Sequence, residues 1–183
     1  MNYIKRNLEN VVSQVTKEYP VVLVTGSRQV GKTTMLQKLM DGTERGYVTL
    51  DDLNERNIAK TDPELFLQLH KPPVLIDEVQ YAPELFTYIK MHVDKNHDPG
   101  AFWLTGSQVF KLMRGVQESL AGRVAVLSLT SLSQAEISGG EMKPFSIEIE
   151  ALNERKKGRE EADTRGIFER IYKGSMPAIV SGA

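Results

Sequence analysis

Hydrophobic positions over the first 130 residues form two alternating patterns. Short, unbroken apolar runs such as Val21–Thr25 are typical of strands that are buried on both faces of a parallel sheet. Between these runs, apolar residues recur every three or four positions, which places them on one face of a helix. The runs predict strands at 21–25, 47–50, 74–76, 101–105 and 124–129, and the segments between them predict helices at 4–19, 33–40, 53–70, 83–93 and from 108 onward.

Strands that alternate with helices form parallel sheets with helices on both faces. The pattern therefore predicts an α/β fold in three layers, with a five-stranded parallel sheet at its centre.

The pattern changes after Thr130. Residues 139–166 are polar with mixed charges, which indicates a linker or an exposed insertion rather than a binding tail. Residues 167–183 predict a helix and a turn, a stretch too short to form a domain by itself.

The composition narrows the class of protein without naming a function. A chain of 183 residues is long enough for one well-buried α/β domain, and its net charge of −1 gives no overall attraction to nucleic acid or anionic membranes. The absence of cysteine excludes disulfides, thiolate zinc sites and cysteine nucleophiles, and suits a cytoplasmic location. No apolar run approaches the length of a membrane span, so we expect neither a signal peptide nor a membrane partner.

One segment matches a phosphate-binding loop. Gly26–Thr33 fits the pattern G-x-x-x-x-G-K-[ST] without a mismatch, between a predicted strand and a predicted helix. Gly26 and Gly31 permit backbone angles that other residues resist, so the amides of the loop can surround an anion. Lys32 is expected to reach the β- and γ-phosphates, and Thr33 to hold Mg²⁺. The predicted nucleotide-binding residues are Gly26, Ser27, Arg28, Gln29, Val30, Gly31, Lys32, Thr33 and Thr34.

Two acids follow the third predicted strand. Parallel sheets bind their ligands at the carboxyl ends of the strands, so Asp77 and Glu78 are expected beside the phosphate loop. Asp77 is predicted to hold Mg²⁺ mostly through water, because this ion keeps part of its hydration shell. Glu78 is placed to polarise the attacking water as a general base. An adjacent glutamate of this kind favours hydrolysis over transfer of phosphate to an acceptor.

Polar residues also follow the fourth strand. Thr105, Ser107 and Gln108 are candidates for a sensor that contacts the γ-phosphate or the water. Alternatively, Ser107 or Gln108 caps the next helix. Gln80, two residues beyond Glu78, either touches the edge of the nucleotide or is a solvated loop residue.

Arg123 stands directly before the fifth predicted strand. Its guanidinium could stabilise charge on the γ-phosphate, either in its own chain or in a neighbouring subunit of a homo-oligomer, and the alternative is a surface salt bridge. Arg28, inside the phosphate loop, contacts phosphate or else faces solvent or an acid. Asp51 and Asp52 end the second strand, either at the active edge or as solvated residues.

Together these segments resemble the AAA-type ATPases of bacteria and archaea that carry a C-terminal domain of unknown function. The resemblance implies an AAA-like ATPase domain over residues 1–138, and a linker and the start of a largely missing second domain over 139–183. The segment Gly174–Pro177 is similar to that start, although Ser175 replaces the second glycine of the usual Gly-Gly-x-Pro. The resemblance rests on residues 26–33, 50–52, 75–80, 104–108 and 120–123.

The resemblance also implies a P-loop NTPase sheet with strand order 5-1-4-3-2. It assigns roles to residues that the motifs had already singled out: Lys32 and Thr33 at the phosphates and Mg²⁺, Asp77 at Mg²⁺, Glu78 as base, Ser107 or Gln108 as sensor, and Arg123 at the position of an arginine finger.

The expected function is binding and hydrolysis of Mg–ATP, to drive or gate a conformational change. A slow nucleotide-dependent switch or a DNA-associated regulator is the alternative, with DNA or a protein as the partner of the missing C-terminal region. A P-loop kinase would need a phosphate acceptor, and Glu78 favours free phosphate instead.

Overall fold

Five parallel strands form the centre of the fold in the computed structural model, which describes residues 3–140, 146–156 and 163–182. Their order across the sheet is β2-β3-β4-β1-β5, and this confirms the predicted order 5-1-4-3-2, counted from the other edge. All neighbouring pairs are parallel. The strands are β1 (Val21–Thr25), β2 (Gly46–Thr49), β3 (Val74–Asp77), β4 (Phe102–Gly106) and β5 (Val124–Ser128).

Burial follows the position of each strand in the sheet. The three inner strands β1, β3 and β4 are buried at every residue, as their unbroken apolar runs predict. The edge strands β2 and β5 are partly exposed, because each has a neighbour on one side only. The phosphate loop and the acids therefore lie at the ends of fully buried strands.

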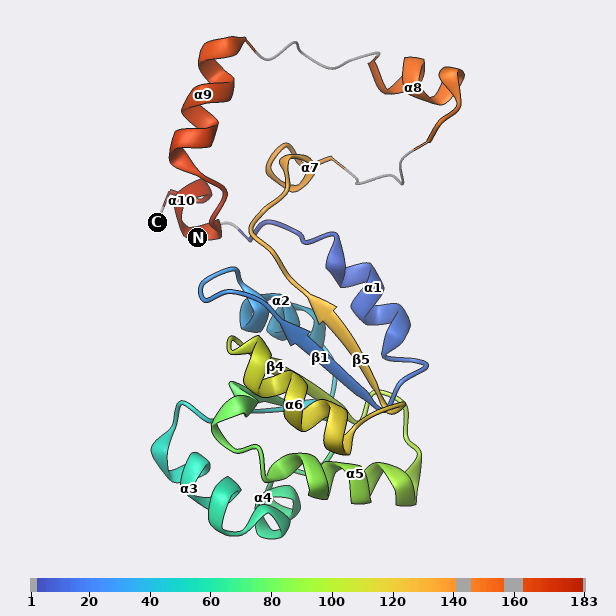
Figure 1. The fold of residues 1–183 in the computed structure, drawn as a ribbon, viewed down its shortest axis with the longest axis vertical. Helices are drawn as coiled ribbons and strands as arrows, with labels where there is room; N and C mark the ends of the chain where they lie inside the picture. The colour runs from blue at the N-terminus through green and yellow to red at the C-terminus, as the bar shows by residue number, and fades with distance from the viewer. Residues whose placement is uncertain (1–2, 141–145, 157–162, 183) are drawn as a thin grey trace. The chain divides into compact units, whose positions relative to one another are not determined.

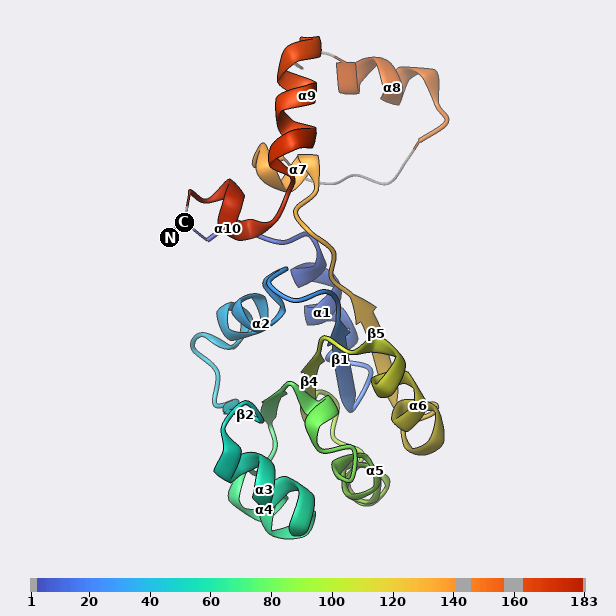
Figure 2. The same cartoon turned by 60° about the vertical axis from the view of Figure 1, so that its left-hand side comes forward.

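Helices cover both faces of the sheet (Figures 1 and 2). On one face, α3 to α6 join Leu23 and Ile76 in one apolar core. On the other, the Trp103 indole donates a hydrogen bond of 3.0 Å to the Thr16 hydroxyl just beyond α1, which packs against α2. The helices are α1 (Leu8–Val15), α2 (Lys32–Met40), α3 (Leu53–Thr61), α4 (Pro63–Leu69), the 3₁₀ turn η1 (Val79–Tyr81), α5 (Leu85–Asn96) and α6 (Val109–Ser119).

The chain divides into two compact units, one spanning Leu8–Thr130 and the other combining the N-terminal segment with the residues after Thr130. In the second unit, Arg6 Nε lies 3.1 Å from Glu136 Oε1, and both side chains are almost fully buried. Burial alone would raise the pKa of Glu136, but hydrogen bonds from the amides of Ser133 and Asn7 and from Arg6 together lower it. Its helices are α7 (Gln134–Ile137), α8 (Ile149–Lys156), α9 (Thr164–Lys173) and α10 (Pro177–Val180).

Two predicted helices differ from those observed. The first begins at Leu8 rather than at residue 4, because Arg6 and the Asn7 amide are engaged by Glu136. The predicted helix at 53–70 is two helices that meet at Asp62, whose carboxylate accepts from the Leu65 amide and caps the second.

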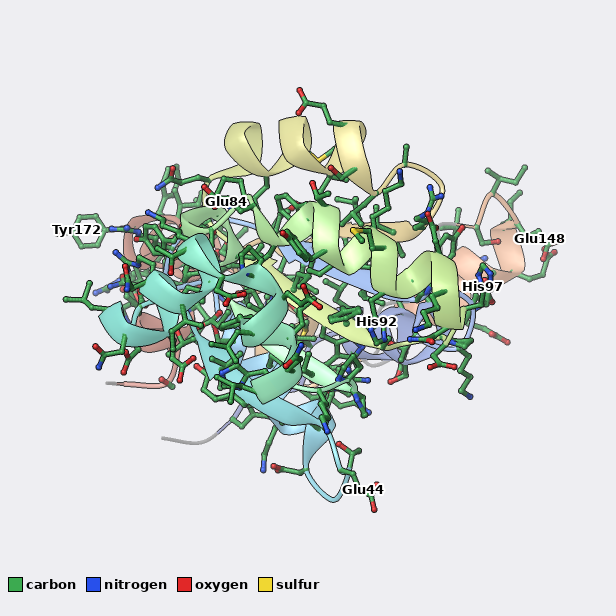
Figure 3. All side chains as sticks on the ribbon, turned by 90° about the horizontal axis from the view of Figure 1, so that it is seen from below. Glu44, Glu84, His92, His97, Glu148 and Tyr172 are labelled. Carbon is green, nitrogen blue, oxygen red and sulfur yellow. The ribbon has the colours of Figure 1, made fainter. Side chains whose placement is uncertain are left out.

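The polar region 139–166 is predicted to be a linker or an exposed insertion, and its parts 141–145 and 157–162 lie outside the described residues. The part within the described residues contains α8. Beyond it, Tyr172 of α9 is 93% exposed and projects outward in Figure 3. Among the described helices, none has both the length and the apolar character that a membrane crossing requires. A domain boundary after residue 138 stays a prediction.

Candidate active site

The phosphate loop leaves β1 in a conformation that requires glycine. Gly26 has φ +146°, and a Cβ placed on it would lie 2.1 Å from the Leu129 carbonyl oxygen. Gly31 has φ +92° and is the residue before α2, where it gives no side-chain cap to the helix. Gly31 therefore offers the first amides of α2 no side-chain acceptor, and phosphate is the kind of group that such a helix end binds.

Lys32 is folded back over the loop. Its Nζ donates to the carbonyl oxygens of Gly26, at 3.1 Å, and Ser27, at 3.0 Å, and the residue is only 5% exposed. Burial lowers the pKa of Lys32, while the nearby Glu78 and Asp77 carboxylates act in the opposite direction. A cation is thus held inside the loop, within reach of any anion that the loop surrounds.

Asp77 is the centre of a hydroxyl cluster at the end of β3. Its Oδ1 accepts from the hydroxyl of Thr33 at 2.7 Å and from that of Thr105, and its Oδ2 lies 3.5 Å from the Tyr47 hydroxyl. The structure therefore brings the two predicted Mg²⁺ ligands, Thr33 and Asp77, into contact. Thr105, a candidate sensor, is fully buried, and its hydroxyl donates to Asp77 and accepts from the Glu78 amide.

Tyr47 is a member of this cluster that sequence reasoning missed. It lies on the same face of β2 as Thr49, whose Cα pairs with that of Asp77, so the alternation of a strand could have pointed to it. Burial, followed by the charge of Asp77, raises the pKa of Tyr47. The tyrosine therefore stays a neutral hydrogen-bond donor toward Asp77.

The Glu78 carboxylate is oriented by two donors. Ser107 Oγ donates to its Oε2 at 3.2 Å, and Gln80 Nε2 donates to the same oxygen. Its backbone is left-handed, with φ +55°, and its amide donates to the Thr105 hydroxyl. Gln80 is only 8% exposed, so its side chain is not solvated and is instead a partner of Glu78.

Of these groups, Lys32, Thr33 and Glu78 line a cavity of about 430 Å³, a volume typical of small-molecule sites. Six of the nine predicted loop residues line it, whereas Gly26, Ser27 and Val30 do not. Val30 is 2% exposed. The lining residues are Arg28, Gln29, Gly31, Lys32, Thr33, Thr34, Asp51, Glu78 and Tyr81.

The remaining candidates take different positions. Arg28 and Asp51 line the cavity, while Asp52 caps α3 by accepting from the amides of Asn54 and Glu55. Gln108 occupies the N-cap position of α6, but within the described residues its side chain makes no capping hydrogen bond. Among the contacts that the structure describes, the Ser107 hydroxyl donates to Glu78.

Arg123 is not brought to this cavity by its own chain. It precedes β5 at the amino end of the strand, whereas the phosphate loop leaves β1 at the opposite, carboxyl end. Its guanidinium pairs with the Asp94 carboxylate, with Nη2 3.1 Å from Oδ2 and Nε bonded to Oδ1. The hydrogen bond to Asp94 raises the pKa of Arg123. The salt-bridge alternative is what the structure contains, and an intramolecular finger is ruled out by this placement.

Residues 18–138 match the family model described as an AAA domain. The chain belongs to the AAA domain family. This AAA domain protein is 38% identical over 119 residues to two uncharacterised proteins, Mb2031c of Mycobacterium bovis and Rv2008c of Mycobacterium tuberculosis. The aligned part covers 64% of this chain and 26% of each relative, so the chain spans about a quarter of their length.

Solved structures share the fold of this AAA domain protein. The Walker-type ATPase PABY2304 of Pyrococcus abyssi has a TM-score of 0.60 at 16% identity, with 98% of this chain and 68% of that one covered. AMPPCP-bound DnaA from Aquifex aeolicus has a TM-score of 0.55 at 15% identity, with 99% and 61% covered. At these identities the likeness shows the fold, and the chemistry has to be argued from the side chains.

Proposed function

We propose that this AAA domain protein binds Mg–ATP in the cavity and hydrolyses it to ADP and phosphate, and that the cycle drives or gates a conformational change. Membership of the family supports nucleotide binding and the ATPase class. The observation that carries the proposal is the orientation of Glu78. Ser107 and Gln80 fix its carboxylate in the same cavity that Lys32 lines.

The residues beside the loop fit a magnesium ion. The Thr33 hydroxyl and the Asp77 carboxylate, 2.7 Å apart, offer only hard oxygen donors, the type that Mg²⁺ prefers. Both would hold the ion, Asp77 mostly through water, and a bound Mg²⁺ would neutralise charge on the phosphates. Tyr47 and Thr105 keep the Asp77 carboxylate oriented toward Thr33.

Each side chain then has one task in hydrolysis. Lys32 exchanges its contacts with the Gly26 and Ser27 carbonyls for phosphate oxygens. The Glu78 carboxylate accepts a proton from water as the water oxygen bonds to the γ-phosphorus. The bond from that phosphorus to the bridging oxygen breaks, so ADP leaves with the electron pair and phosphate forms. Ser107, as a donor to Glu78, senses the state of this base.

Removal of divalent ions tests this proposal directly. In excess Mg²⁺, we expect saturable ATP binding and release of ADP and free phosphate in equal amounts. Chelation with EDTA is expected to lower turnover at least about 100-fold, because the phosphate charge is then left unneutralised. Phosphate release and nucleotide binding are measured together. Transfer of the phosphate to an acceptor, or the lack of any saturable binding, would contradict hydrolysis.

A slow switch is a second candidate that one observation favours. Arg123 is bound to Asp94 and precedes β5, at the opposite end of the strands from the phosphate loop, so it does not act as a finger at the site of its own chain. Binding without rapid turnover would suit a switch whose nucleotide state matters more than its rate. Nothing in the net charge of −1 supports strong DNA binding by the chain itself.

The position of Arg123 leads to a mixing experiment. If a neighbouring copy supplies this guanidinium, Arg123→Ala should lower turnover about 100-fold or more, as expected for loss of an arginine finger. The variants Arg123→Ala and Glu78→Gln should each be inactive alone, yet regain turnover when mixed. In the mixture, one variant contributes Glu78 and the other contributes Arg123. Turnover per subunit should also rise with protein concentration.

The matched control is Arg165→Ala, which removes an arginine that is 86% exposed on α9. It should leave turnover unchanged. A mixture that is no more active than the sum of its two variants, together with turnover that is flat with concentration, would remove the finger role of Arg123.

A further inference from the structure

Arg56 holds the wall of the cavity that faces the phosphate loop. It is not one of the lining residues, but two of them, Asp51 and Tyr81, are its direct contacts. Its Nη2 lies 3.8 Å from Asp51 Oδ1, and its guanidinium carbon lies 4.0 Å from the centre of the Tyr81 ring. A third contact anchors it, since its Nε donates to the Leu50 carbonyl oxygen at 2.6 Å. One side chain therefore joins the ends of two neighbouring strands.

The guanidinium group is suited to this arrangement. Its flat face stacks on an aromatic ring while its edge donates hydrogen bonds, and lysine cannot do both at once. The position on the helix is also fixed: the Arg56 amide donates to the Asp52 carbonyl at 3.0 Å, one turn after the Asp52 cap. The Arg56 side chain is 24% exposed, so it is partly buried against these contacts rather than free on the surface.

Tyr81 connects this anchor to the proposed base. Glu78, Gln80 and Tyr81 belong to one tight turn, which the Tyr81 amide closes on the Glu78 carbonyl oxygen at 3.1 Å. Within the turn, Gln80 donates to the Glu78 carboxylate. Arg56 contacts the far end of the turn, so it restrains the backbone that carries both the base and its donor.

We propose that Arg56 is a positioning residue for hydrolysis, which acts through Tyr81 on Glu78 and also holds Asp51, a second residue that lines the cavity. The inference rests on the proposed ATPase function. Because Arg56 does not line the cavity, its loss should leave the phosphate loop and the binding of nucleotide largely intact. Loss of a precisely held base instead lowers the rate of the chemical step.

The test is a comparison of turnover with binding in the full chain. Arg56→Ala is expected to lower kcat at least about tenfold, while the Kd for Mg–ATP changes less than about threefold. Lys60→Ala, on the exposed side of the same helix, is the matched control and should change neither quantity. Arg56→Lys, which keeps the charge but loses the stacked fork, should recover only part of kcat.

A second pair of variants tests the route through Tyr81 if Arg56→Ala folds poorly. Tyr81→Leu removes the ring and should lower kcat more than Tyr81→Phe, which keeps it. The double variant Arg56→Ala with Tyr81→Leu should lose no more than the larger single loss, because both changes remove one contact.

If the wild-type protein hydrolyses ATP and Arg56→Ala has the same kcat, the positioning role is overturned while the proposed function stands. Equal kcat values for the two Tyr81 variants would have the same meaning. A tenfold rise in Kd with kcat preserved would overturn the positioning role too, since Arg56 would then act in binding. A wild-type protein that binds Mg–ATP but never releases phosphate would overturn the proposed function together with this inference.

Discussion

Glu78→Gln should bind Mg–ATP as tightly as the wild-type protein and yet hydrolyse it 10²- to 10⁴-fold more slowly, which is about the contribution of a general base. Glutamine keeps the shape of the side chain and an oxygen that can still accept from Ser107 and Gln80, so the local geometry should survive. What disappears is the basic carboxylate. Single-turnover phosphate release, measured beside the Kd of a fluorescent ATP analogue, separates the two effects.

A control for the Glu78 prediction is a glutamate just before a neighbouring helix. Glu84→Gln changes an exposed glutamate next to α5 and should leave both turnover and binding as they are. Full turnover by Glu78→Gln would show that another group takes the proton. Weakened binding with normal single-turnover chemistry would assign Glu78 to the nucleotide rather than to the water.

Lys32→Ala is expected to weaken nucleotide binding at least about 100-fold, enough to abolish it at ordinary concentrations. The charged nitrogen is almost fully buried in the loop, and truncation of one member of a buried charge pair typically costs about 2–5 kcal/mol. Tenfold in Kd corresponds to about 1.4 kcal/mol, so the low end of this range already accounts for most of the expected loss. Isothermal titration with Mg–ATP gives the Kd directly.

Lys38→Ala is the matched control for Lys32, since it removes an exposed lysine of the same helix whose partner is Asp41. Its Kd should equal that of the wild-type protein. If Lys32→Ala bound Mg–ATP normally while Lys38→Ala did not, the phosphate loop would not be the binding site.

The edge of the sheet where the site lies could be predicted from the sequence because strand ends are local features. An unbroken apolar run predicts an inner strand, and the residue that follows it lies at the carboxyl edge. The phosphate loop follows Thr25 and the acids follow Ile76, so in a parallel sheet both are expected at the carboxyl ends of the strands. The contact of Thr33 with Asp77 is the result.

The same logic, applied in full, would have placed Arg123 correctly. It comes directly before a strand, so it lies at the amino edge, whereas the loop and the acids follow strands and lie at the other edge. Its partner Asp94 could not be predicted, because their contact depends on how α5 packs beside the start of β5. A residue before a strand and a residue after one belong to opposite ends of the sheet.

Arg56 and Gln80 were beyond prediction for another reason. Arg56 sits 25 positions before Tyr81, and only the packing of α3 beside the turn after β3 brings the guanidinium over the ring. Gln80 comes only three residues after β3, yet its burial depends on a 3₁₀ turn that has no periodic hydrophobic pattern from which it could be predicted. Contacts of this kind arise from tertiary packing rather than from local sequence.

The absence of a Cβ at Gly26 lets the phosphate loop lie directly against the backbone at Leu129, whose amide also donates to the Thr25 carbonyl at 2.8 Å. Leu129 comes two residues before Ser131, where the chain passes from one compact unit to the other. Main chain rests on main chain there, with no flexible side chain to absorb a displacement. Any displacement of the loop at Gly26 as phosphate binds or leaves would therefore act directly on the backbone of Leu129, within the same compact unit.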